Sequence, residues 1–278
     1  MGFAVTKFGQ ILMNDNLDEM TTRDLPELND ESVDIGEAPS QQLQQQTDVK
    51  DLETPLDAPV SYAKHGFRYG CYRFVKRTFD IFSSGLVLLI LSPLILILLF
   101  IKWVEDWSNP VYVSWRVGKN KKDGSRGKNI KFHKIRSMCK NADKMKQQLI
   151  DEGKNEADGP VFKMKDDPRI TRFGKFLRKS SLDELLQLWD IFVGRMSVVG
   201  PRPPLPKEVD EYTPHQMHRL DIKGGLLCLW QVRKNRNDVK FDEWVKLDVE
   251  YIKNQSLWLD MKIIVKGFVM VLFDRSGE

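Results

Sequence analysis

A long uncharged stretch dominates the hydrophobic pattern of the chain. It runs from Ile81 to Ile101, and its 21 residues meet the length of about 20 that an α-helix needs to span the apolar core of a bilayer. Ser92-Pro93 lies at its middle. Proline removes a backbone donor and clashes with the preceding turn, which kinks or breaks a helix. The pattern therefore predicts a membrane-embedded helix that is broken at Pro93.

Both flanks of this stretch are basic. Residues 61–80 carry five Lys or Arg against Asp80, and residues 102–122 carry five against two acids. Basic flanks favour the cytoplasmic side of a membrane. A straight span would export one flank, whereas a helix that enters and leaves through the same face keeps both inside. The charges therefore favour a re-entrant helix, with an ordinary proline-kinked span as the alternative.

Downstream, the pattern predicts an α+β structure that is mostly helical. Residues 111–117 and 130–136 alternate between apolar and polar positions, as the strands of a hairpin do. A polar helix is expected over residues 139–155, followed by a loop with turn signals over 156–172. Apolar residues then recur at helical spacing, at Leu182, Leu185, Leu186 and Trp189.

The C-terminal segment carries another apolar helix face. Its members run from Trp258 to Leu272, with Lys262 and Lys266 elsewhere on the same predicted helix. A helix with this distribution lies in the surface of a membrane or packs on the core of its own domain. We expect an amphipathic helix here, and the sequence favours neither surface over the other.

Charge is distributed unevenly along the chain. Residues 1–60 contain 13 acidic and 3 basic residues and a glutamine-rich run, a composition typical of disorder. The remainder is basic, which favours anionic partners such as lipid headgroups, nucleotides or nucleic acid. The three cysteines are far apart in the sequence, so no disulfide framework is expected.

The most informative polar segment is Ser181-Leu182-Asp183-Glu184. By its local pattern it is a capping box, in which Ser181 caps a helix and Glu184 reaches back to the backbone. Its surroundings support another interpretation, because five cations lie just upstream, from Arg169 to Lys179. Two carboxylates among cations at the positive end of a helix indicate a site for phosphate and a metal ion.

The residues of this site suit different tasks. The helix dipole and the arginines are expected to keep Asp183 ionised, as a carboxylate nucleophile must be. Glu184 is a hard oxygen ligand of the kind that Mg²⁺ prefers, and substrate phosphates and water can complete the coordination. Arg202 stands between prolines that would fix its direction. Its guanidinium fork matches the geometry of pyrophosphate.

These residues form part of a longer series of motifs. The series comprises Lys76-Arg77-Thr78-Phe79-Asp80, Ser92-Pro93, Lys134-Ile135-Arg136-Ser137-Met138, Asp167-Pro168-Arg169-Ile170-Thr171-Arg172, Leu177 to Leu185, Met196 to Pro203, Trp230-Gln231-Val232, Phe241-Asp242-Glu243-Trp244 and Leu247-Asp248. With these motifs in this order, residues from about Lys76 to Val271 resemble the bacterial sugar transferase family. Its members are polyprenyl-phosphate phosphoglycosyl transferases with one membrane-embedded segment.

The resemblance implies a reaction in two steps. Asp183 would attack the phosphate attached to the sugar of a UDP-sugar, forming a sugar-phosphoryl aspartate and releasing UMP. Polyprenyl phosphate, in bacteria undecaprenyl phosphate, would then take the sugar-1-phosphate. Glu184 would hold Mg²⁺. The remaining site residues implied for substrate binding are Arg136, Arg178, Arg202, Arg236 and Asp248.

The resemblance also implies an architecture and a place in the cell. It supports the re-entrant helix and a monotopic protein on the cytoplasmic face of the bacterial inner membrane, where it starts a surface polysaccharide or glycoconjugate. The expected regions are an acidic disordered tail (1–60), a membrane-associated region (61–110), a cytoplasmic catalytic domain (111–255), and a C-terminal amphipathic helix and tail (256–278). Membrane lipids are expected partners, and self-association is left open.

Some positions depart from the family pattern. Gly224 stands where proline is usual, and Arg233-Lys234-Asn235 replaces the usual Ser-Gly with one residue added. Both changes alter the loop that carries Arg236. A non-catalytic membrane adaptor on the same fold is the alternative function, which the intact Asp183-Glu184 pair disfavours. Nucleic-acid binding is not expected, because the chain lacks a base-reading motif and its cations surround carboxylates.

Overall fold

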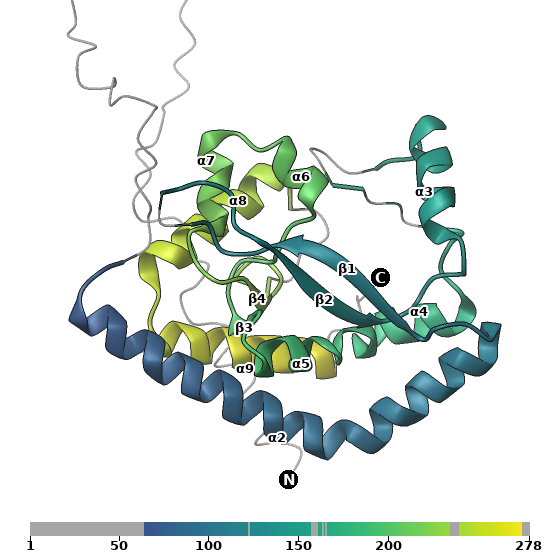
Figure 1. The fold of residues 1–278 in the computed structure, drawn as a ribbon, viewed down its shortest axis with the longest axis horizontal. Coiled ribbons are helices and arrows are strands. Elements are labelled where there is room, and N and C mark those ends of the chain that lie inside the picture. The colour runs from purple at the N-terminus through teal and green to yellow at the C-terminus, as the bar shows by residue number, and fades with distance from the viewer. Residues whose placement is uncertain are drawn as a thin grey trace, which may run out of the picture. The chain divides into compact units, whose positions relative to one another are not determined.

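A computed structural model describes residues 64–121, 123–156, 161–162, 164, 166–233 and 239–273. The acidic tail predicted over residues 1–60 lies outside this part of the chain. The described residues form an α+β structure that is mostly helical, with two small sheets (Figure 1). This agrees with the predicted fold class.

The apolar stretch forms part of one long helix, α2, from Phe67 to Asp106. Among the described residues it is the one helix long and apolar enough to cross a membrane, and 17% of its most apolar window is buried. The helix bends near its middle (Figure 1) but is not interrupted at Pro93. The predicted break is therefore a bend within a continuous helix.

A serine explains how the helix continues past its proline. In a regular α-helix the amide of residue 93 would donate to the carbonyl of Leu89, and Pro93 has no amide hydrogen to give. The hydroxyl of Ser92 donates to this carbonyl instead, at 2.8 Å. A polar backbone group in an apolar segment thereby keeps a hydrogen-bond partner.

Two short sheets lie in the rest of the chain. Strands β1 (Val111–Val117) and β2 (Asn129–Ile135) form the predicted antiparallel hairpin. Strands β3 (Ser197–Val199) and β4 (Gly225–Leu227) pair in parallel. A Cβ atom at Gly225 would lie 2.1 Å from the amide nitrogen of Gly200. The close approach of the two backbones therefore requires glycine at this position.

The remaining elements are short helices around these sheets. They are α3 (Ala142–Asp151), α4 (Arg172–Lys179), η2 (Leu182–Glu184), α5 (Gln187–Phe192), α6 (Pro206–Asp210), α7 (Pro214–Met217), η3 (His218–Leu220), α8 (Phe241–Asn254) and α9 (Leu257–Phe273), where η marks a 3₁₀ turn. The polar helix predicted over 139–155 is thus shorter than expected. Helix α8 was not predicted, although the apolar residues Phe241, Val245, Val249 and Ile252 follow a helical period.

The capping box predicted at Ser181 is wrong. Ser181 has a φ of 55°, in the left-handed region, and its side chain makes no capping hydrogen bond. The carboxylate of Glu184 contacts Lys134 and Arg202 instead of turning back to the backbone. The predicted helix is accordingly divided into η2 and α5. Ionic partners distant in the sequence override the local capping pattern.

Helix α2 packs against the body of the chain at several points. Leu98 joins a buried cluster with Ile135 of β2 and Leu177 of α4. The guanidinium of Arg77 donates to the carbonyls of Ile191 and Phe192, at 2.6 and 2.8 Å. These carbonyls lie at the C-terminal end of α5, where a cation is favourable for the helix. Arg77, in the basic flank of α2, therefore attaches this helix to the end of α5.

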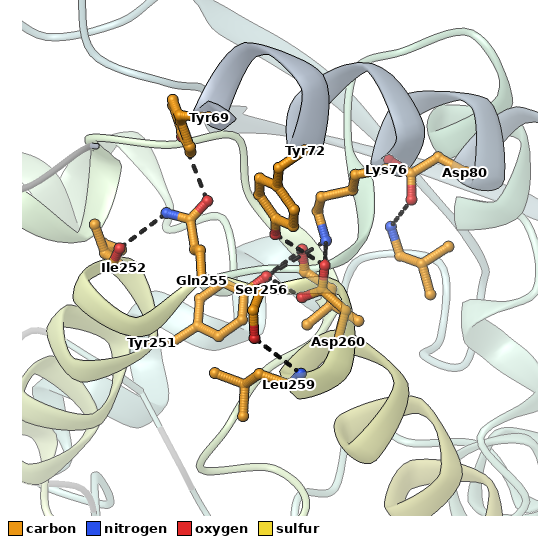
Figure 2. A network of polar contacts seen from close by, with 12 residues as sticks. Tyr69, Tyr72, Lys76, Asp80, Tyr251, Ile252, Gln255, Ser256, Leu259 and Asp260 are labelled. Carbon is orange, nitrogen blue, oxygen red and sulfur yellow. Dashed lines mark hydrogen bonds and ion pairs between the residues drawn. The ribbon is translucent and has the colours of Figure 1, made fainter. Parts of the chain in front are cut away.

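A buried polar network joins the start of α2 to the C-terminal helices (Figure 2). Its centre is the carboxylate of Asp260 on α9, which accepts hydrogen bonds from Lys76 and Tyr72 of α2, each at 2.8 Å. The hydroxyl of Tyr251 on α8 donates to its other oxygen at 2.5 Å. Because each of these groups has a partner, the network can be buried without a large desolvation cost.

Helix α9 packs through a face other than the predicted one. Asp260 and Ile263 are buried, and Gly267 lies against the side chain of Leu227. The predicted apolar face is left largely open, since Trp258 is 70% exposed and Phe268 is 64% exposed. Helix α9 thus packs on the core through one face and exposes apolar side chains on another.

Candidate active site

Four elements bring the charged residues of the site together. Asp183 and Glu184 lie in η2, which follows directly on α4 and its residue Arg178. Lys134 comes from β2, and Arg202 follows β3. The site therefore depends on contacts between segments that are far apart in the sequence.

Lys134 holds both carboxylates. Its ammonium nitrogen lies 2.8 Å from Glu184 Oε1 and 3.4 Å from Asp183 Oδ2. Arg202 Nη2 contacts the same oxygen of Glu184 at 3.3 Å. The Asp183 residue is only 6% exposed. Adjacent carboxylates, one buried and one half-buried, are tolerated here because two cations offset their charge.

The environment separates the pKa values of the two carboxyl groups. Burial raises the pKa of Asp183 above its ordinary value, and the charge of Glu184 adds to this while Lys134 opposes it. Burial would also raise the pKa of Glu184, but Lys134 and Arg202 outweigh it and hold that pKa well below its usual range. Glu184 is therefore a permanent anion at neutral pH, and Asp183 is the more basic carboxylate.

The expected effect of a helix dipole on Asp183 has no basis in the structure. Asp183 lies in a 3₁₀ turn of three residues rather than at the start of an α-helix. Such a short turn has little aligned dipole. Lys134 and Arg178 favour the ionised form of Asp183, but burial outweighs them and the pKa of Asp183 lies above its ordinary value, contrary to the expectation.

The loop that carries Arg202 is fixed by its carbonyl groups. The carbonyl of Pro201 accepts from the amide of Gly225, and that of Pro204 accepts from the amide of Val117, each at 2.9 Å. The prolines were expected to fix the direction of Arg202. The structure adds the hydrogen bonds that attach this stiff segment to β1 and β4.

Other predicted site residues have partners of their own. Arg178 donates to the hydroxyl of Ser137 at 2.9 Å and lies within electrostatic reach of Asp183. Arg136 pairs with Asp106 at the end of α2, at 2.5 Å. Asp248 pairs with the buried Arg219 at 2.8 Å. The substrate-binding roles of Arg136 and Asp248 remain predictions, and Arg236 lies outside the described residues.

Lys134 is the residue that sequence reasoning missed as part of the site. Lys134 belongs to the Lys134-Ile135-Arg136 motif, but the sequence alone indicates no role for it in the site. The available signal was the strand alternation of residues 130–136, which places Lys134 and Phe132 on one face of the hairpin. Alternation alone does not show which face meets the carboxylates, because that depends on how the hairpin packs.

The donor groups of the site suit one kind of metal binding. Among the described residues there is no group of three or more His, Cys, Asp or Glu side chains placed to hold a metal ion. Asp183 and Glu184 offer carboxylate oxygens only. Mg²⁺ commonly binds through one or two carboxylates and takes its other ligands from substrate phosphates and water. The residues present therefore fit Mg²⁺ that arrives with a phosphorylated substrate.

Comparison with known proteins places the chain in a family. Residues 71–274 match the bacterial sugar transferase family. The chain is 38% identical over 219 residues to galactosyl transferase CpsE of Streptococcus agalactiae, covering 79% of this chain and 46% of the relative. It is 41% identical over 208 residues to undecaprenyl-phosphate galactose phosphotransferase of Salmonella typhimurium, covering 72% and 41%.

A shorter relative is covered more completely. Exopolysaccharide production protein ExoY of Rhizobium meliloti is 36% identical over 204 residues, which cover 73% of this chain and 87% of the relative. In contrast, the matched part of this chain spans less than half the length of the galactosyl transferase and the galactose phosphotransferase. By its match over most of its length, the chain belongs to the bacterial sugar transferase family.

Proposed function

We propose that the chain transfers a sugar-1-phosphate from a UDP-sugar to undecaprenyl phosphate and so starts a surface polysaccharide or glycoconjugate. The observation that carries this proposal is the Asp183-Glu184 pair held by Lys134 and Arg202. The names of relatives support it. One is a UDP-glucose:undecaprenyl-phosphate glucose-1-phosphate transferase of Klebsiella pneumoniae, 34% identical over 207 residues.

In the proposed first step Asp183 is the nucleophile. A carboxylate oxygen of Asp183 bonds to the phosphorus that bears the sugar, and the bond from this phosphorus to the bridging oxygen breaks. UMP leaves with that oxygen, and a sugar-phosphoryl aspartate remains. A phosphate oxygen of undecaprenyl phosphate then attacks the same phosphorus, which releases Asp183 and gives a sugar diphosphate lipid. Burial raises the pKa of Asp183, which makes its ionised form a stronger base, and the charges of Lys134 and Arg178 favour that ionised form.

The neighbouring residues would stabilise charge. Lys134 and Arg202 hold Glu184 in the unliganded site and can donate to the phosphates of the substrate. Glu184, a permanent anion, would hold Mg²⁺ together with the substrate phosphates. When bound, this metal ion offsets negative charge on the leaving phosphate. Arg178, whose charge acts on Asp183, would neutralise the phosphoryl group.

The same proposal places the protein at the inner membrane with its catalytic domain on the cytoplasmic face. Apolar side chains are exposed along α2, among them Phe82, Leu89 and Ile97. Helix α5, which packs against α2, exposes the stacked rings of Trp189 and Phe192. Aromatic residues are favoured where a membrane meets water. These surfaces support a protein that rests on the bilayer from one side.

The re-entrant arrangement predicts that two lysines, one on each side of α2 in the sequence, both lie on the cytoplasmic side of the membrane. Lys64→Cys and Lys119→Cys, each in a chain lacking Cys71, Cys139 and Cys228, should resist a membrane-impermeant maleimide in intact cells. Both should react after permeabilisation, because basic flanks stay in the cytoplasm. Labelling of one site from outside would contradict the re-entrant arrangement. Pro93→Ala in the same background should straighten α2 and increase labelling of one site from outside.

The activity itself can be tested with purified protein in detergent. Mixing it with undecaprenyl phosphate, Mg²⁺ and each of a panel of UDP-sugars should release UMP with at least one sugar. The product should carry both the sugar and a second phosphate on the lipid. Heat-inactivated protein is the control. Absence of UMP release with every sugar, from protein that is folded, would favour the membrane adaptor instead.

A further inference from the structure

Arg116 lies beside the site but has no part in the proposed mechanism. It comes from β1, and its Nη1 donates to the carbonyl of Pro203 at 3.2 Å. Its guanidinium lies 5.0 Å from the centre of the buried Phe132 ring. Lys134 lies 5.8 Å from the centre of the same ring. Arg116 therefore contacts Pro203, which follows Arg202, and the Phe132 ring, which Lys134 also contacts. Arg202 and Lys134 are the two cations that hold Glu184.

Arg116 lies among other charged groups of the site. Burial lowers the pKa of Arg116 to about 10, and the positive charge of Arg202 adds to this effect. The negative charges of Glu208 and Glu184 oppose this effect, and the Glu208 carboxylate also accepts from the amide of Leu205 at 2.8 Å. Like charges that are partly desolvated repel each other unless an anion lies between them.

One donor of Arg116 has no partner in the part of the chain that the structure describes. Its Nε is buried and makes no hydrogen bond there. Buried polar groups are normally paired, and an exception requires an explanation. A guanidinium presents its donors in one plane and matches the oxygens of a phosphate. The unpaired donor of a guanidinium beside the carboxylate pair therefore indicates an oxyanion ligand such as a phosphate.

We propose that Arg116 is a further phosphate-binding residue, which together with Arg202 takes the diphosphate of the nucleotide-sugar substrate. The inference rests on the proposed function, since it concerns the same site. The hydrogen bond to Pro203, the residue after Arg202, attaches Arg116 to the loop that carries Arg202, and the charge of Arg202 acts on Arg116. The cation–π contact with Phe132 also helps to position the guanidinium of Arg116.

The test measures the binding of UDP and of inorganic pyrophosphate to the full chain in detergent, by calorimetry. Arg116→Gln should weaken the binding of both probes at least tenfold. Arg116→Lys retains the charge and the aliphatic stem but not the planar fork, so its effect should be smaller. Lys131→Gln is the matched control. It lies on the neighbouring strand, over the exposed ring of Trp115, and should change binding less than twofold.

A double variant separates direct binding from mere support of Arg202. If Arg116 binds phosphate itself, Arg116→Gln should still weaken UDP binding severalfold in an Arg202→Gln chain. Loss of the whole effect in that chain would show that Arg116 acts only by positioning Arg202, which overturns the proposal. Unchanged UDP affinity of Arg116→Gln would also overturn it. If the wild-type chain binds neither probe, the proposed function itself fails, and this inference fails with it.

Discussion

Asp183→Asn is expected to abolish both UMP release and formation of the lipid product. The substitution keeps the shape of the side chain but removes the negative charge that attacks phosphorus. Loss of a nucleophile typically lowers the rate by roughly 10⁴-fold or more. The measurement is UMP release from UDP-sugar, with and without undecaprenyl phosphate. Substantial turnover by Asp183→Asn would rule out the proposed nucleophile.

Glu184→Gln is the matched comparison for this variant, because it removes the adjacent carboxylate charge. It should weaken the dependence on Mg²⁺ and slow both half-reactions, yet still permit some covalent adduct. The wild-type chain incubated with UDP-sugar but without lipid should gain one sugar-phosphate mass on the peptide that contains Asp183. An adduct mapped to Glu184 would reverse the two roles. UMP release that required the lipid would indicate a single displacement.

Lys134→Gln is expected to shift the pH dependence of the reaction as well as its rate. Lys134 lowers the pKa of Asp183, which burial raises. Without the ammonium group the pKa of Asp183 rises further, so a smaller fraction is the reactive anion at a given acidic pH. The acidic limb of kcat/KM should therefore move to higher pH. The lost stabilisation of phosphate charge should lower the plateau by about 10²-fold.

The profile should be measured between pH 4.5 and 8 on the variant and the wild type. Lys131→Gln is a suitable control, because Lys131 is on β2 but on the opposite face from Lys134. Its acidic limb should match that of the wild type. An acidic limb that stays in place in Lys134→Gln, with only a lower plateau, would show that Lys134 does not tune Asp183.

Much of the architecture was evident from local patterns. The uncharged run from Ile81 to Ile101 predicted the long apolar helix, because length and composition decide whether a segment can enter a bilayer. Alternation over 111–117 and 130–136 predicted the hairpin to within one residue. The motif order identified the family, and the Asp183-Glu184 pair and Arg202 do lie together.

Local patterns failed where distant segments decide the outcome. Ser181-Leu182-Asp183-Glu184 is a capping box by spacing, yet Lys134 and Arg202 take the Glu184 carboxylate. Lys134 itself gave no sign of its role, since alternation does not say which strand face meets which loop. The ion pair of Arg136 with Asp106 was equally hidden from local patterns, because it forms only when the end of α2 lies beside β2.

The sequence by itself therefore determined the long apolar helix, the hairpin, the family and the central carboxylate pair. Each of these is encoded in residue types at short spacing. Only the tertiary structure decided the continuity of α2 through Pro93, the partners of its basic flank and the opposite pKa directions of Asp183 and Glu184. These properties depend on burial and on charges from other segments, which become neighbours only when the chain folds.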